Sequence, residues 1–174
     1  MPGAAPLALR RATAADEAFL YRVYASTRAD ELAGTGWDED AKEAFLRMQY
    51  EAQARSYRAA HPDACFDLVL VHGTPAGRLC VDRDGAAIHV VDIALLPEHR
   101  GRGVGTQLLG ALLAEAAGAA RRVTLSVERS NPAARLYARL GFEVVRPGDV
   151  YSELEWSPPP LRSLPAGGAP GAGR

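Results

Sequence analysis

A short loop rich in glycine and arginine, residues 100–105 (RGRGVG), lies between an apolar stretch and an apolar segment with helical spacing. Its glycines allow several backbone N–H groups to come close together, and the first N–H groups of a helix have no partners within that helix. The helix N-terminus adds a partial positive charge, and Arg100 and Arg102 add full charges beside it. The loop therefore suits an anion, best a phosphate or a pyrophosphate.

Two common phosphate-binding loops do not fit this segment. A P-loop needs the pattern GxxxxGK followed by Ser or Thr, and this loop contains no Lys. A dinucleotide-binding loop needs GxGxxG, but the last position is Thr106 when counted from Gly101 and Leu108 when counted from Gly103. A purely structural glycine-rich turn is the remaining alternative.

The elements that must position this loop can be predicted from periodicity and from Gly and Pro punctuation. Strands are predicted at 7–11, 66–72, 77–83, 86–95, 123–127, 142–146 and 150–156, and helices at 13–28, 39–58, 103–117 and between Asn131 and Gly141. The long apolar strand 86–95 is expected at the centre of a mixed sheet with helices on its faces. The buried face of helix 39–58 is predicted to consist of Ala41, Ala44, Phe45, Met48 and Ala52.

The composition fits one domain and argues against several classes of partner. A chain of 174 residues can bury a stable core without disulfide bonds or a structural metal. The 20 Lys and Arg residues balance the 21 Asp and Glu residues, so the net charge does not favour binding to nucleic acid or to a membrane surface. Cys65 and Cys80 match no metal or redox motif and are expected to be buried reduced thiols. No signal segment or membrane span is recognisable, so the expected location is cytoplasmic. The domain is expected at 7–156, between a flexible N-terminus (1–6) and a disordered Pro/Gly/Ala-rich tail (157–174).

Two motifs, in correct order and spacing, resemble those of the GNAT N-acetyltransferase superfamily. Residues 100–105 fit the signature R/Q-x-x-G-x-G/A at a strand-to-helix junction, and residues 131–142 (NPAARLYARLGF) resemble the family's second conserved block. The resemblance implies an α/β (α+β) fold, with one mixed, twisted, mostly antiparallel sheet of about seven strands flanked by about four helices. It also implies that the sheet splays open between its fourth and fifth strands and holds acyl-CoA in the gap.

By this resemblance the loop binds acetyl-CoA as a co-substrate, and no metal is expected. The residues expected at the pyrophosphate, mainly through backbone N–H groups, are Arg100, Gly101, Arg102, Gly103, Val104, Gly105 and Thr106. Main-chain groups of Ile93, Ala94 and Leu95 are expected to pair with the pantetheine arm like an extra strand. Asn131 matches a polar residue that contacts pantetheine, although a helix cap explains it equally well.

The resemblance also indicates catalytic groups. Tyr137 matches the Tyr that donates to the departing sulfur, and an ordinary pKa of about 10 suits that role; the alternative is a core aromatic beside Leu136 and Leu140. Family members often carry Glu or His eleven positions before the signature, which is His89 here, acting directly or through a water, and Asp92 is the neighbouring alternative. The third alternative is that no protein side chain serves as the base. In a regular strand these two side chains face opposite ways, and a bulge would change that.

The expected reaction is acetyl transfer to a primary amine of a small molecule or peptide, by direct attack in a ternary complex. The acceptor is expected against the first two helices and their connection, where the candidate residues are Arg28, Asp30, Glu31, Trp37 and Asp38. Gln49, Gln53 and Tyr57 form a stripe on the second helix that joins these candidates, and this stripe is interpreted as a surface or an interface rather than a binding face. The histidines interpreted as surface residues are His61, His72 and His99.

Two other functions stay open. One is a non-catalytic acyl-CoA-binding or regulatory module of the same fold, and the other is an enzyme with a different acyl donor or an oxygen acceptor. A homodimer is left open as well.

Overall fold

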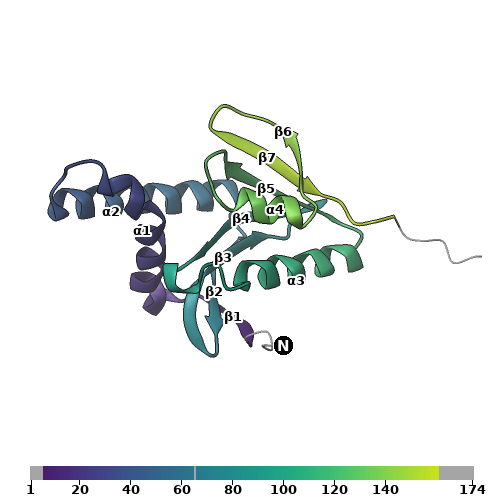
Figure 1. The fold of residues 1–174 in the computed structure, drawn as a ribbon. Coiled ribbons are helices and arrows are strands. Elements are labelled where there is room, and N and C mark those ends of the chain that lie inside the picture. Colours follow the sequence, from purple (N-terminus) through teal and green to yellow (C-terminus); the bar gives the residue numbers. More distant parts are fainter. Residues whose placement is uncertain (1–5, 65, 161–174) are drawn as a thin grey trace, which may run out of the picture.

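A single seven-stranded sheet with helices on both faces forms the framework of the computed structural model, which describes residues 6–64 and 66–160 (Figure 1). The strands are β1 (Leu7–Arg11), β2 (Phe66–Val71), β3 (Thr74–Asp82), β4 (Ala87–Leu95), β5 (Arg122–Glu128), β6 (Glu143–Arg146) and β7 (Tyr151–Trp156). The helices are α1 (Glu17–Ala33), α2 (Glu39–Ala60), α3 (Val104–Gly118) and α4 (Ala134–Arg139), with short 3-10 turns η1 (Ala14–Asp16) and η2 (Pro97–His99). The predicted fold class is confirmed.

Parts of the predictions fall outside the described residues. These parts are most of the expected flexible N-terminus, most of the expected tail, and Cys65. Among the elements, α1 extends to Ala33 rather than to 28, and β3 begins at Thr74, so that part of the expected turn at 73–76 belongs to the strand. No helix in the described part of the chain is long and apolar enough to cross a membrane.

The sheet opens at its centre. In the order β1-β2-β3-β4-β5-β7-β6, only the β4–β5 pair is parallel. That pair joins residues 87–90 to residues 122–125 and goes no further. Beyond this point β4 continues beside β3, and β5 continues beside β7. The two strands therefore diverge, as predicted, and each turns a main-chain edge towards the gap between them.

A bulge in β4 lies where the gap begins. In the antiparallel register Asp92 lies opposite Cys80, and His89 lies opposite Asp82. Between these two pairs β4 contains one residue more than β3, which is a β-bulge. Because Cys80 and Asp82 are two residues apart on β3, their side chains share a face, and so do those of His89 and Asp92. The expectation for a regular strand is therefore wrong: both candidate bases face the same side of the sheet.

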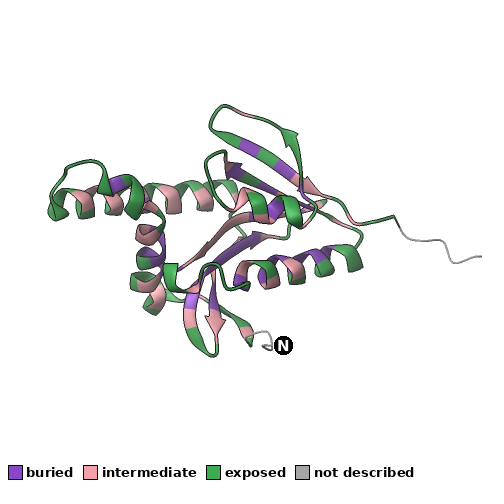
Figure 2. Cartoon of the chain, in the orientation of Figure 1, coloured by how far each residue is buried: buried purple, intermediate pink, exposed green. Residues whose placement is uncertain are grey.

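The two faces of the sheet bury different cores. On one face, α3 and α4 pack against Leu79, Ile88 and Leu125 of the central strands. On the other, α1 and α2 enclose a smaller core that includes Tyr24 and Leu68. Figure 2 shows buried residues running along the central strands and along α3. Since Ile88 enters the α3 core, the neighbouring position 89 faces the side that α1 and α2 cover.

The buried face of α2 differs from the predicted one. Met48 is 57% exposed, whereas Tyr50 is buried and Leu46 packs against the same core. Gln49, Gln53 and Tyr57 continue this inward face and are half-buried. The apolar periodicity was misleading because α2 covers a part of the sheet that carries polar and charged side chains.

Candidate active site

The loop between β4 and α3 offers backbone donors that the fold itself does not use. Gly101 and Gly103 adopt φ angles of 68° and 80°, a left-handed conformation that disfavours residues with a Cβ. The first bond of α3 runs from the Gln107 N–H to the Gly103 carbonyl at 3.0 Å. Within the described residues, the N–H groups of 103–106 have no backbone acceptor. Such a run of donors at a helix start fits a phosphate or a pyrophosphate.

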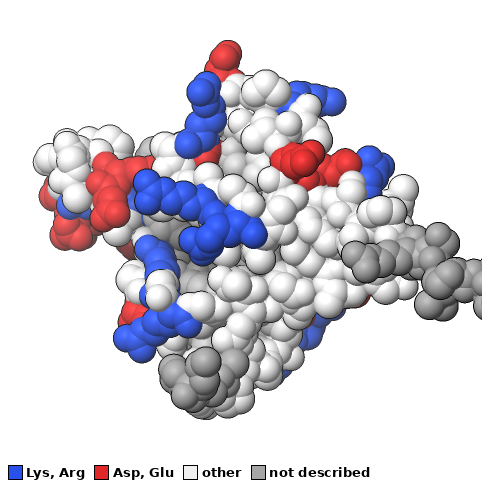
Figure 3. Space-filling view, turned by 45° about the vertical axis from the view of Figure 1, so that its right-hand side comes forward, with Lys and Arg blue, Asp and Glu red and all other residues white. Residues whose placement is uncertain are grey.

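The side chain of Arg100 ties this loop to α1. Its Nε donates to the Leu95 carbonyl at 2.8 Å, and its Nη2 donates to Ser26 Oγ at 3.2 Å. One carbonyl of the predicted pantetheine edge is thus already bonded within the chain. Arg102 is exposed. Phosphate binding by either arginine stays a prediction. Figure 3 shows Lys and Arg side chains gathered on one face of the molecule, beside a group of acidic side chains.

Tyr137 belongs to the core through its ring. It is 5% exposed and packs edge-on against Phe142, with ring centroids 5.7 Å apart. Burial raises the pKa of Tyr137 to about 12, and the negative charge of Asp92 adds to the rise. The hydroxyl therefore keeps its proton at neutral pH.

Asp92 forms a buried ion pair that sequence reasoning missed. Its Oδ2 lies 2.7 Å from Arg78 Nε, and the two side chains are 15% and 2% exposed. Arg78 Nη2 donates to Gln53 Oε1 at 3.1 Å, and the guanidinium lies 5.7 Å from the ring centroid of Tyr24 and 5.0 Å from that of Phe66. Burial raises the pKa of Asp92, while the charge of Arg78 opposes the rise. The signal available in the sequence was an Arg between Gly77 and the apolar run Leu79–Val81 in the middle of a strand.

The polar stripe of α2 faces the sheet, so its interpretation as a surface is wrong. The Tyr24 hydroxyl donates to Gln49 Oε1 at 3.2 Å, and Gln53 contacts the buried guanidinium. Burial raises the pKa of Tyr57, and the charge of Asp92 adds to the rise. The same surroundings raise the pKa of the buried Cys80 thiol to about 12. α2 therefore brings polar groups over β3 and β4.

His89 lies where β4 and β5 still pair. Its Nδ1 is 2.9 Å from Thr124 Oγ1, and its ring stacks on His61 with centroids 5.1 Å apart and 17° between planes. His61 Nδ1 lies 2.7 Å from Asp82 Oδ2. Burial lowers the pKa of His89, and His61 contributes to the lowering. The prediction that His61 is a surface residue is wrong, since its side chain is 23% exposed and is held by both contacts.

The remaining candidates have local partners. Asn131 Oδ1 accepts the Ala133 N–H at 2.9 Å in the turn before α4, but the N-cap of α4 is Ala133, so the prediction that Asn131 caps this helix is wrong. Its contact with pantetheine stays a prediction. Asp38 accepts an N–H group in the first turn of α2. Arg28, which is half-buried, pairs with Glu31 of α1 at 3.0 Å. Asp30 and Trp37 are exposed. None of these contacts identifies an acceptor.

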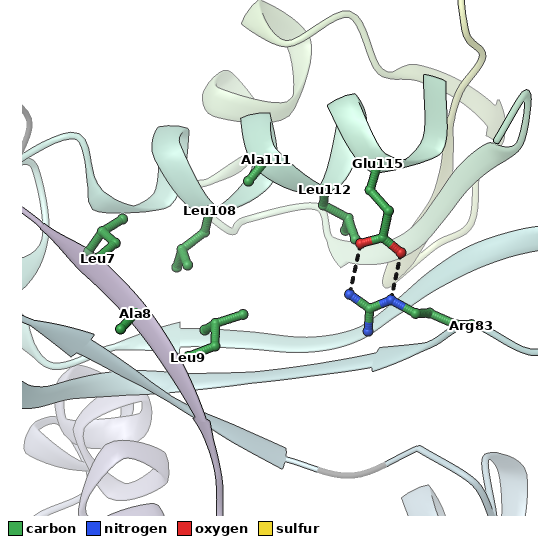
Figure 4. Close-up of a pocket in the computed structure, with 8 residues that line it drawn as sticks. All are labelled: Leu7, Ala8, Leu9, Arg83, Leu108, Ala111, Leu112 and Glu115. Carbon is green, nitrogen blue, oxygen red and sulfur yellow. Dashed lines mark hydrogen bonds and ion pairs between the residues drawn. The ribbon is translucent and has the colours of Figure 1, made fainter. Parts of the chain in front are cut away.

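A groove of about 190 Å³ lies elsewhere, between β1 and α3 (Figure 4). Its lining residues are Leu7, Ala8, Leu9, Arg83, Leu108, Ala111, Leu112 and Glu115. The two charged residues bind each other through two hydrogen bonds of 2.7 and 3.0 Å. With an apolar wall and its only ion pair satisfied, the groove lacks groups for proton transfer or anion binding, so the gap between β4 and β5 is the better candidate site.

Known proteins resemble the chain over most of its length. The model of the acetyltransferase (GNAT) family matches residues 14–142. PaiA N-acetyltransferase from Thermoplasma acidophilum, solved in complex with coenzyme A, has a TM-score of 0.65 at 19% identity, over 87% of this chain and 99% of that one. An acetyltransferase from Thermus thermophilus has a TM-score of 0.61 at 22% identity, over 87% and 96%. A Corynebacterium glutamicum protein described as "histone acetyltransferase HPA2 and related acetyltransferase" has a TM-score of 0.62 at 24% identity, over 91% and 99%.

At these identities the solved structures establish a likeness of fold. The family match includes both the glycine loop at 100–105, which follows β4, and the block at 131–142, which follows β5. The chain belongs to the GNAT acetyltransferase family.

Proposed function

We propose that the chain transfers an acetyl group from acetyl-CoA to a primary amine of a small molecule or peptide, by direct attack in a ternary complex. The observation that carries this proposal is the run of unpaired N–H groups at 103–106 beside the gap between β4 and β5. Family membership supports acyl-CoA chemistry. The fold neighbour described as an N-acetyltransferase in complex with coenzyme A supports nitrogen as the acceptor atom.

The chain's own groups fit such a donor. The N–H groups of 103–106 suit the pyrophosphate, and the unpaired edge of β4 at Ile93 and Ala94 suits the amide-bearing pantetheine arm. When bound, acetyl-CoA supplies the acetyl group as a reactive thioester. Asp92 and His89 face the side of the sheet covered by α1 and α2, which is the side on which we expect the acceptor.

Acetyl transfer needs a base for the acceptor and a proton for the departing sulfur. With Nδ1 of His89 at Thr124, its Nε2 is the atom that takes a proton from the acceptor ammonium. The amine nitrogen then bonds to the acetyl carbon as the carbon–sulfur bond breaks, and Tyr137 gives its hydroxyl proton to sulfur. The second proton lost by the acceptor nitrogen restores Tyr137, and the proton taken by His89 leaves to solvent. Asp92 is less suited to be the base because Arg78 already binds its carboxylate.

Ligand-induced stabilisation and thiol release test this function together. At a hundred times its Kd, acetyl-CoA should stabilise the fold by about 2.7 kcal/mol, visible as a rise in Tm. A panel of amines should then include at least one that causes release of free CoA thiol. The absence of any thermal shift would contradict acetyl-CoA as the donor. Stabilisation without thiol release from any amine would favour the non-catalytic acyl-CoA-binding module.

Gly103→Ala should weaken acetyl-CoA binding by roughly tenfold or more, equivalent to about 1.4 kcal/mol, in a calorimetric titration. A Cβ there meets no protein atom within 4 Å, so the added methyl group would stand in the open space where a phosphate approaches. The left-handed φ of 80° adds backbone strain.

Gly85→Ala is the matched control for that strain. Gly85 has a φ of 88°, also lies in open space, and belongs to the β3–β4 connection away from the loop. The Gly85→Ala variant should be less stable than wild type but bind acetyl-CoA with the same Kd. Equal affinities in the two variants would show that the pyrophosphate does not bind at Gly103.

A further inference from the structure

Four side chains from four different elements meet on the side of the sheet covered by α1 and α2. They are His61 at the end of α2, Asp82 on β3, His89 on β4 and Thr124 on β5. The contacts run from Asp82 to His61 at 2.7 Å, from the ring of His61 to the ring of His89 at 5.1 Å, and from His89 to Thr124 at 2.9 Å. The proposed chemistry uses only His89 and leaves His61 and Asp82 without a role.

The carboxylate of Asp82 holds the ring of His61 in place. Its Oδ2 contacts His61 Nδ1, and its Oδ1 accepts the Asp84 N–H at 2.9 Å, so that both oxygens are fixed. The contact with His61 also lowers the pKa of Asp82, which keeps the carboxylate charged at neutral pH. A carboxylate at Nδ1 orients an imidazole and stabilises its protonated form.

The stacking brings the two imidazoles close enough for a charge on one to act on the other. Two positive charges with rings 5.1 Å apart repel each other, so protonation of one ring disfavours protonation of the other. The carboxylate of Asp82 lies against Nδ1 of His61, whereas Nδ1 of His89 lies against the hydroxyl of Thr124. The charged groups that act on His89 are His61, Asp82 and Glu153 of β7; the two carboxylates favour its protonation, and His61 opposes it.

We propose that His61, held by Asp82, is a positioning residue for His89: it holds the second face of the His89 ring and keeps that ring neutral, with a lone pair free to accept a proton. Thr124 fixes the ring edge, and His61 fixes its plane. Only the identification of His89 as the base rests on the proposed function, because the stacking and the contact with Asp82 belong to the protein without substrates.

An NMR titration of the His89 imidazole in the ligand-free protein tests this inference. The signal is assigned by its loss in His89→Gln. In His61→Gln the titration midpoint of His89 should rise by roughly half a unit or more, because a neighbouring positive charge has been removed. His61→Phe keeps an aromatic ring on the stack without the charge and should produce the same rise, which covers the case in which His61→Gln does not fold.

The matched control is His72→Asn. His72 is exposed in the turn between β2 and β3, with a φ of 50° that Asn tolerates, and it should leave the midpoint of His89 unchanged. An unchanged midpoint in both His61 variants would overturn the inference. So would an equal rise in His72→Asn, since the effect would then not come from the stacked ring.

The pH profile of thiol release connects the inference to turnover. In His61→Gln the acid limb of kcat/KM should move to higher pH by the same amount as the NMR midpoint, while kcat/KM well above that limb approaches the wild-type value. A loss that is equal at every pH would overturn the part of the inference by which His61 keeps the His89 ring neutral. If no amine supports turnover, the proposed function fails, and the NMR titration still decides whether His61 controls the protonation of His89.

Discussion

Tyr137→Phe should lower kcat for acetyl transfer by roughly a hundredfold or more, because proton donation by a positioned side chain contributes about 10²–10⁴ in rate. The variant removes a single hydroxyl and keeps the ring that packs on Phe142 within the core. Kd for acetyl-CoA and Tm should therefore stay close to wild type. Steady-state thiol release gives the rate, and calorimetric titration gives the affinity.

The pKa of Tyr137 adds a second signature. Since burial raises this pKa to about 12, the hydroxyl stays protonated up to about that pH. A tyrosine with an ordinary pKa of about 10 would begin to lose its proton near pH 9. Wild-type kcat should therefore show no decline from Tyr137 between pH 7 and pH 10.

Tyr151→Phe is the matched control, because Tyr151 is 55% exposed on β7. Its kcat should equal that of wild type. If Tyr137→Phe also kept the wild-type kcat, Tyr137 would be a core aromatic only, and the proton for the departing sulfur would have to come from another group or from water.

The fold and the glycine loop could be predicted because their signals are local. The left-handed angles at Gly101 and Gly103 need glycine at those two positions, and the apolar run of α3 reads directly as a buried helix. Strand and helix limits differ from the prediction mainly at ends such as Ala33, where the α1 pattern gives no clear stop. In the glycine loop and in α3, the local sequence is therefore enough to predict the local conformation.

The side of the site that faces α1 and α2 could not be predicted because it depends on pairings between distant residues. The bulge that brings His89 and Asp92 to one face is a property of the β3–β4 register, and it leaves no mark in β4 alone. The apolar stripe of α2 predicts the wrong inward face, because the sheet that α2 covers carries the charged side chains of Arg78 and Asp92. His61 meets Asp82 across 21 positions of sequence.

Arg78→Met should reduce the free energy of unfolding at pH 7 by about 3–5 kcal/mol, the cost of breaking a buried ion pair by removing one partner. Met replaces the aliphatic part of Arg78, but Asp92 is left in a nearly closed site without its counter-charge. Urea denaturation measures the loss. Arg83→Met is the matched control: Arg83 Nε lies at the same 2.7 Å from Glu115, but the two side chains are 46% and 43% exposed, so that the loss should stay below about 1 kcal/mol.

The loss in Arg78→Met should shrink as the pH falls. Burial raises the pKa of Asp92, and Arg78 opposes that rise, so without Arg78 the folded state binds a proton at a higher pH than the unfolded chain does. A group whose pKa is raised on folding stabilises the fold at low pH and loses that contribution as the pH rises. The difference in the free energy of unfolding between wild type and Arg78→Met should therefore be smaller at pH 5 than at pH 7.

Adding Asp92→Asn to Arg78→Met should recover most of the stability at pH 7, because the buried group no longer carries a charge. If the double variant were as unstable as Arg78→Met, the loss would come from the packing of Arg78 between Tyr24 and Phe66 and not from the uncompensated charge of Asp92.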